Sequence, residues 1–203
     1  MARIAQVCAV ILVAAAIGTA AAGLPGQDQN STANGRLARP FESGGRMYMN
    51  LSAGAYRIEG TRDNEIRVRW RTRNPEDMSS VRAKMDVKGR DATLRLDGPG
   101  NNFSANVELP ERTDVTIHLS AGDLDVRRLE GSKDIDMWAG DLTVEVGDTS
   151  KYRHVSASVR SGEISASPFK VNKGGLFRSF QADGAGSYDL RVKLMAGDLK
   201  LVR

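Results

Sequence analysis

Cysteine is almost absent from this chain of 203 residues, because Cys8 is the only one and it lies in an apolar N-terminal stretch. The rest of the chain therefore has no disulfide, no thiolate zinc ligand and no thiol nucleophile. Aromatic residues make up only 5% of the sequence, and no stretch beyond the N-terminal segment shows a convincing helical periodicity. The fold must then be held by a thin apolar core and by backbone hydrogen bonds.

Strong catalytic motifs are also absent, including the Gly-x-Ser-x-Gly nucleophile turn. We therefore expect no enzyme activity, no cofactor and no metal site. The net charge of +4 comes from 29 basic and 25 acidic residues that are interleaved along the chain, which describes a mildly basic, solvated surface. We expect no nucleic acid as a partner, since aromatic residues do not alternate with the charged ones.

Residues 1–22 have the composition of a secretory signal peptide. Arg3 precedes an apolar run over residues 4–18, and the small residues Ala20 and Ala22 precede a cleavage site after Ala22. The run is short for a transmembrane span, so we expect cleavage and no membrane anchor afterwards. The signal predicts export to the periplasm or the cell surface.

The rest of the chain divides into two parts. Residues 23–40 are rich in polar turn formers and show no periodicity, which predicts a flexible tether. Over residues 41–203 apolar and polar side chains alternate almost continuously, as around Met49, Val68 and Ile117. Period-two alternation is typical of half-buried β-strands, so residues 41–203 are predicted to form a single all-β domain.

One short phrase, apolar-x-[Ala/Ser]-Gly-[Asp/Glu]-apolar, recurs down this domain, and an earlier copy lacks the acid. Across the glycine the apolar phase slips by one residue, which would turn side chains to the wrong face unless the chain bends there. Glycine permits such a bend, and the following carboxylate can accept backbone N–H groups freed by it. The predicted corners are Gly54, Gly122, Asp123, Gly140, Asp141, Gly162, Glu163, Gly197 and Asp198.

The spacing of the corner glycines predicts a stacked architecture. Gly122 and Gly140 are 18 residues apart, and Gly140 and Gly162 are 22 apart, about the length of one β-solenoid coil. The 35 residues from Gly162 to Gly197 fit two coils with one degenerate corner. We therefore predict a β-solenoid, and the alternative is an antiparallel β-sandwich in which the phrase is a hairpin turn. The coil count over residues 41–115 stays open.

Four copies of the phrase carry a resemblance to a known family: Ser120–Leu124, Trp138–Leu142, Arg160–Ile164 and Met195–Leu199. Together with the signal peptide and the tether, they resemble the bacterial "putative adhesin" β-strand repeat proteins, which also carry a domain-of-unknown-function label. The resemblance covers about residues 41–203. It implies a single-stranded right-handed β-solenoid at the cell envelope, and it supplies no catalytic residues.

The strongest candidate binding residues are Arg67, Arg69, Arg71 and Arg73, which alternate along one predicted strand. Side chains at i and i+2 lie about 7 Å apart on one face, a spacing that suits a repeating anion. Guanidinium groups bind phosphate and carboxylate, so the ligand would be an anionic polymer such as an acidic glycan or lipopolysaccharide. The alternative is a solvated face paired with acids on neighbouring coils. Trp138 precedes a corner and could stack on a sugar ring.

These observations predict a non-catalytic, adhesin-like protein of the cell envelope that presents a binding or scaffold surface. Its partner would be an envelope protein or an anionic glycan or lipid. One alternative is a self-assembling structural element, because the chain ends at Lys200–Arg203 directly after a corner and would leave the edge of the last coil open for self-association. Another is a polysaccharide-acting β-helix enzyme, which would need paired carboxylates in a cleft.

Overall fold

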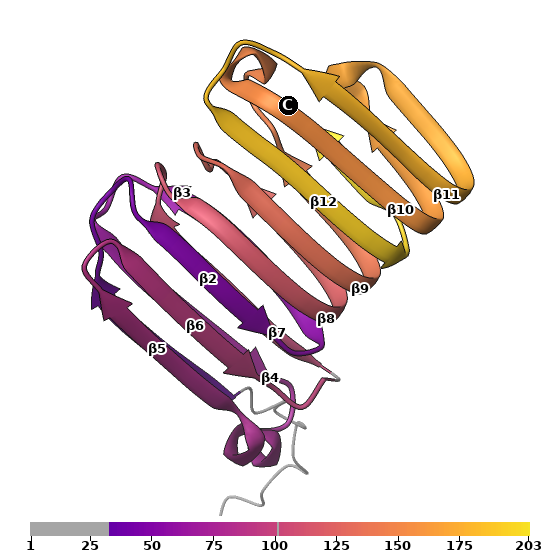
Figure 1. Ribbon diagram of the computed structural model, residues 1–203. Helices are drawn as coiled ribbons and strands as arrows, with labels where there is room; N and C mark the ends of the chain where they lie inside the picture. The colour runs from indigo at the N-terminus through magenta and orange to yellow at the C-terminus, as the bar shows by residue number, and fades with distance from the viewer. Residues whose placement is uncertain (1–32, 101) are drawn as a thin grey trace, which may run out of the picture.

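The computed structural model describes residues 33–100 and 102–203, and these residues confirm the all-β prediction. The signal peptide predicted for residues 1–22 lies outside them. In this part of the chain no helix is long and apolar enough to cross a membrane. The strands stack side by side into an elongated body (Figure 1). The elements are β1 (Ala33–Pro40), β2 (Arg46–Leu51), β3 (Gly54–Thr61), β4 (Glu65–Thr72), η1 (Pro75–Ser80), β5 (Arg82–Lys88), β6 (Asp91–Asp97), β7 (Phe103–Pro110), β8 (Asp114–Arg127), β9 (Lys133–Glu145), η2 (Thr149–Lys151), β10 (Tyr152–Ala166), η3 (Ser167–Phe169), β11 (Val171–Asp183), β12 (Tyr188–Ala196) and β13 (Leu199–Val202).

Three copies of the repeated phrase lie inside single long strands and not at hairpin turns. β8, β9 and β10 each run continuously through their corner glycine. β8 pairs with β9 in parallel on both sides of the corner, with Gly122 opposite Gly140. Gly54, at the start of β3, pairs in parallel with Gly122. The alternative prediction, an antiparallel β-sandwich in which the phrase forms a hairpin turn, is therefore wrong at these corners.

Close backbone contact at the corners explains why the phrase needs glycine. A Cβ added at Gly122 would lie 1.9 Å from the carbonyl oxygen of Gly54. The same contact would arise at Gly140 against the carbonyl of Gly122. It recurs at Gly197 against Gly140 and at Gly162 against Gly197. The φ angles of these four corner glycines run from +117° to +138°, a region that L side chains rarely adopt.

The corners stack in an order that differs from the chain order: Gly54, Gly122, Gly140, Gly197, Gly162. The C-terminal strands β12 and β13 lie between β9 and β10 and pair in parallel with both. The prediction that the last coil leaves an open edge is therefore wrong, because β13 has a neighbour on each side. On its other side Gly162 pairs with Gly175 of β11, which runs antiparallel to β10. The two coils predicted between Gly162 and Gly197, with a degenerate corner near Gly184 or Gly186, are therefore wrong, because this segment contains the antiparallel strand β11.

Antiparallel strands close the two ends of the stack. At one end β4 pairs with β7 and β1, and β5 pairs with β6; at the other end β11 pairs with β10. The flexible tether predicted for residues 23–40 is wrong over residues 33–40, because these form β1 along β4. Leu37 is the one large apolar residue of β1 and packs against the core. Residues 33–40 therefore form a strand because they pair with β4, although their sequence lacks the alternation of apolar and polar residues.

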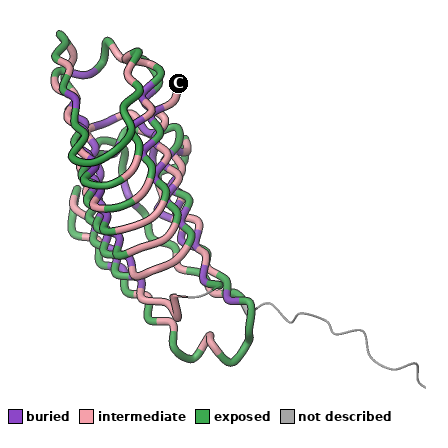
Figure 2. Tube along the Cα trace, turned by 90° about the vertical axis from the view of Figure 1, so that its right-hand side faces the viewer, coloured by how far each residue is buried: buried purple, intermediate pink, exposed green. Residues whose placement is uncertain are grey.

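Inward side chains form apolar rows that cross the stack from strand to strand, and Figure 2 shows buried positions on the inner side of the nested bends. Before the corner, Ile117 of β8 lies beside Ile135 of β9, and after it Leu124 lies beside Leu142. None of these four side chains is more than 1% exposed. The polar residues between them point outward, so each strand half presents one face to solvent.

Two outer faces result, one on each side of the line of corners. The first face is formed by β5, β6, β2 and the halves of β8 and β9 that precede the corner. The second face is formed by β1, β4, β7, β3 and the halves of β8 and β9 that follow it.

The stacked corners predict a large difference between two glycine substitutions. Gly140→Ala should lower the free energy of unfolding by more than about 3 kcal/mol, because the new methyl group would meet the Gly122 carbonyl at a positive φ. Gly147→Ala is also at positive φ, but no atom lies within 4 Å of the added Cβ, so it should cost only about 1 kcal/mol. Urea unfolding followed by circular dichroism measures both losses. Equal losses would contradict the close contact at the corners.

Candidate functional site

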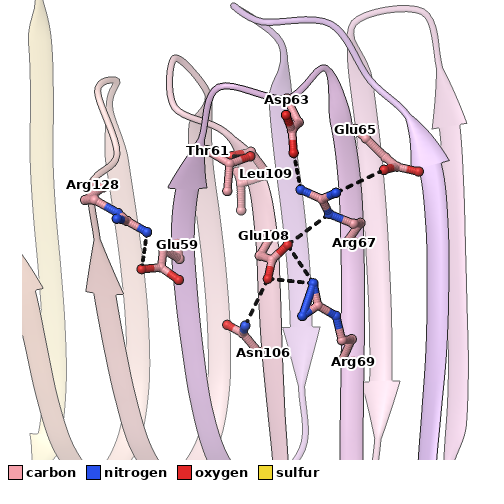
Figure 3. A network of polar contacts seen from close by, with 10 residues as sticks. All are labelled: Glu59, Thr61, Asp63, Glu65, Arg67, Arg69, Asn106, Glu108, Leu109 and Arg128. Atoms are coloured by element: carbon pink, nitrogen blue, oxygen red, sulfur yellow. Dashed lines mark hydrogen bonds and ion pairs between the residues drawn. The ribbon is translucent and has the colours of Figure 1, made fainter.

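The predicted binding arginines lie on the second face, but two of them are engaged by a neighbouring strand. Arg67, Arg69 and Arg71 point outward from β4, and Arg73 follows the end of that strand. β7 runs antiparallel beside β4 and brings the Glu108 carboxylate to them. Arg67 donates from Nε to Glu108 at 2.9 Å, and Arg69 donates from Nη2 to both Glu108 oxygens at 2.8 and 2.9 Å (Figure 3).

Arg67 has further acidic partners. It donates to Asp63, and this hydrogen bond is the main reason why the pKa of the Arg67 guanidinium is raised. Glu65 lies 3.7 Å from the same guanidinium. Arg67 and Arg69 therefore have the pairing with neighbouring acids that the alternative interpretation expects. Their binding to an anionic polymer stays a prediction.

A shallow groove of about 800 Å³ crosses the second face from strand to strand. Its sides are two rows of outward residues that the strand registers bring together. One row consists of Asn34, Arg71, Ser104, Ala55 and Asp123, and the other of Arg36, Arg69, Asn106, Arg57 and Asp125. We call this the arginine groove. It contains two of the four predicted arginines together with Arg57, which the sequence places near them, and it adds Arg36, which the sequence did not single out.

The charges of the arginine groove are unevenly distributed. Arg71 donates to the Ser104 hydroxyl at 2.8 Å, and neither Arg71 nor Arg36 has an acidic partner within residues 33–100 and 102–203. Arg57 lies 3.3 Å from Asp125, which also accepts from Arg127 at 2.8 Å. The end of the groove over β1 and β4 is therefore cationic, with two guanidiniums available to a ligand.

The corner acids form an outward row directly after the corner glycines. The Asp198 carboxylate accepts from the backbone N–H of Glu163 at 3.0 Å, so the expected capping is found there. Asp123, Asp141 and Glu163 are exposed, and no described backbone N–H donates to their side chains. Within the described ranges, no three His, Cys, Asp or Glu side chains are grouped as metal ligands.

A buried lysine is the polar residue that the sequence analysis missed. Lys133 opens β9 in an apolar row, between Val115 of β8 and Leu190 of β12, and it is 1% exposed. Its position has the same inward phase as the apolar residues at positions 135 and 137, and that phase was the available signal.

The environment of Lys133 disfavours its charged form. The ammonium donates to the Tyr152 hydroxyl at 2.8 Å and to the Gly131 carbonyl at 3.2 Å, and no carboxylate of the described residues lies within ion-pair distance. Removal from water is the main reason why the pKa of Lys133 falls to about 8. The protonated side chain therefore lowers the stability of the fold at neutral pH.

Comparisons by sequence identify no family, since no protein-family model and no curated protein matches the chain. The fold has a solved counterpart. A structure from Clostridium sporogenes ATCC 15579, described as a "putative cell adhesion protein", has a TM-score of 0.55 and 16% identity, and the match covers 83% of this chain and 99% of that one. A "putative adhesin" from Parabacteroides merdae ATCC 43184 has a TM-score of 0.33 and 9% identity over 86% and 98% of the two chains. The Clostridium sporogenes structure therefore shares this fold.

The buried lysine predicts an unusual dependence of stability on pH. The folded chain releases the Lys133 proton near pH 8, whereas the unfolded chain keeps it up to about pH 10.5, so the free energy of unfolding should rise between these values. The variant Lys133→Leu/Tyr152→Phe should lack this rise and should be about 1–3 kcal/mol more stable than the native protein at pH 7. Urea unfolding at pH 7, 8 and 9.5 measures both effects.

The single variant Tyr152→Phe is the control, because it removes the hydroxyl acceptor and leaves the ammonium in place. It should be less stable than the native protein at pH 7. A double variant that loses stability at pH 7 would contradict the cost assigned to Lys133.

Proposed function

We propose that the protein is a non-catalytic, adhesin-like component of the cell envelope, and that its arginine groove binds an anionic polymer. The observation that carries this proposal is the pair of cations without acidic partners in the described chain, Arg36 and Arg71, on either side of one groove. The description of the Clostridium sporogenes counterpart as a cell adhesion protein supports the adhesin-like role. The pattern of residues 1–22 supports export.

We propose further that the fold is a single-stranded, right-handed β-solenoid in which one coil is out of chain order. Each coil consists of a strand half, a glycine corner and a second strand half. β12 and β13 form the coil that enters between β9 and β10. Parallel registers across the corners support this proposal, and the antiparallel strands at the ends act as caps.

The geometry of the groove suits an extended ligand that crosses the strands. Adjacent strands lie about 4.8 Å apart, so Arg71 and Arg36 face a ligand from neighbouring strands β4 and β1. A guanidinium can donate two parallel hydrogen bonds to a carboxylate or a phosphate. Glu108 holds Arg69 in the same row as Arg36, and Ser104 holds Arg71 in the other row. Donors aligned in rows across the strands suit repeated anions along a polymer.

Retention on immobilised polymers tests this function. The variant Arg36→Gln/Arg71→Gln should bind polygalacturonate, or lipopolysaccharide, at least about tenfold more weakly than the native protein, since charge-assisted hydrogen bonds contribute about 1.5–3 kcal/mol. Loss on polygalacturonate alone indicates a carboxylate ligand, and loss on lipopolysaccharide alone indicates a phosphate ligand.

The matched control is Arg82→Gln/Lys88→Gln, which removes the same charge from exposed positions of β5 on the other face. It should bind both polymers like the native protein. Equal weakening by the two double variants would reduce the effect to net charge and would contradict a site in the arginine groove.

A further inference from the structure

A second groove, of about 400 Å³, lies on the first face and is unlike the arginine groove in its chemistry. The strand registers again build it from two rows of outward side chains, across β6, β2, β8 and β9. The registers align one row of Arg95, Asn50, His118 and Asp136. The other row consists of the lining residues two positions further along each chain segment: Asp97, Ser52, Ser120 and Trp138. We call this the tryptophan groove.

Trp138 is the one large aromatic side chain of this groove, and it is 66% exposed. The two residues beside it in the row, Ser120 and Ser52, are small, so they leave the face of the groove open next to the indole. Both serines are already held by hydrogen bonds: Ser52 Oγ accepts from the Gly98 backbone N–H at 2.8 Å, and Ser120 Oγ donates to the Leu51 carbonyl at 3.4 Å. In this groove the indole of Trp138 projects into solvent beside two small serine side chains that are held by hydrogen bonds.

The opposite row supplies free hydrogen-bonding groups. Asn50, His118 and Asp136 lie on three successive strands, and none of their side chains has a hydrogen-bond or ion-pair partner in the described part of the chain. The amide can donate and accept, the imidazole can do both, and the carboxylate accepts. Arg95 is occupied by Asp97, with its Nε 3.2 Å from the carboxylate.

We propose that the tryptophan groove binds an uncharged oligosaccharide, with one sugar ring stacked on Trp138 and its hydroxyls bonded to Asn50, His118 and Asp136. A pyranose ring has an apolar C–H face and hydroxyls that donate and accept around its edge. The indole of Trp138 provides a flat apolar surface on which the C–H face of the ring can stack. The mixed donors and acceptors of Asn50, His118 and Asp136 match the hydroxyls around the edge of the ring.

The charge of the groove selects against the other occupants. Arg95 is neutralised by Asp97, and Asp136 has Lys193 of β12 as its register neighbour, so the groove offers a phosphate or carboxylate no excess of positive charge. A protein partner would need a larger apolar area than one indole offers. This site is independent of the arginine groove, because it lies on the other face and its ligand carries no charge.

The two tryptophans of the chain make a direct test available, because their indole N–H groups give separate signals in an NMR spectrum of the ¹⁵N-labelled protein. Trp70→Phe and Trp138→Phe assign the signals. Maltohexaose and cellohexaose are titrated to millimolar concentration. The Trp138 signal should shift and saturate with at least one of them, while the Trp70 signal stays in place. Trp138→Ala should weaken the affinity by about tenfold or more.

Phe177→Ala is the matched control, since Phe177 is 72% exposed but lies on β11, outside the groove. It should bind the oligosaccharide like the native protein, and Asp136→Asn should weaken binding less than Trp138→Ala. No shift of the Trp138 signal with either oligosaccharide, or unchanged affinity in Trp138→Ala, would overturn the proposal. A shift with polygalacturonate fragments only would overturn the assignment of an uncharged ligand. Loss of binding in Arg36→Gln/Arg71→Gln concerns the arginine groove and leaves this proposal unaffected.

Discussion

Direct contact between stacked glycine backbones is the constraint on which the rest of the structure depends. At the corners of Gly122, Gly140, Gly197 and Gly162 the chain passes so close to its neighbour that a single methyl group would overlap a carbonyl oxygen. The bend that this permits restores the inward phase of the apolar side chains after the slip at the glycine. The two halves of β8 and β9 can then bury one apolar row each, and a protein with few aromatic residues still has a continuous core.

The same constraint produces both candidate binding surfaces. Because the corners are in register, outward side chains of neighbouring strands also align, and each face carries straight rows in which successive side chains lie about 4.8 Å apart. The second face collects guanidiniums around Arg36 and Arg71, whereas the first collects Asn50, His118 and Asp136 beside Trp138. One backbone arrangement thus gives two grooves with different side-chain chemistry on opposite sides of one line of glycines.

Local signals predicted the strands and the corners, because alternation and the phase slip at residues such as Gly122 are visible in a few consecutive residues. The spatial order was not predictable in this way. Every copy of the phrase has the same corner backbone, so either Gly162 or Gly197 could stack on Gly140. The segments that connect the copies determine which of the two does so. The arginines show the same limit, since Glu108, which engages both Arg67 and Arg69, is 41 and 39 residues further along the chain.

Cysteine cross-linking tests the stacking order most directly, in a protein whose one native cysteine has been changed by Cys8→Ser. Lys200 of β13 pairs with Thr143 of β9, so Thr143→Cys/Lys200→Cys should form a disulfide on mild oxidation. Ser165 of β10 lies one strand beyond Lys200, about 10 Å from Thr143, so Thr143→Cys/Ser165→Cys should stay reduced. A disulfide in the second variant and none in the first would show coils stacked in chain order and would contradict this account.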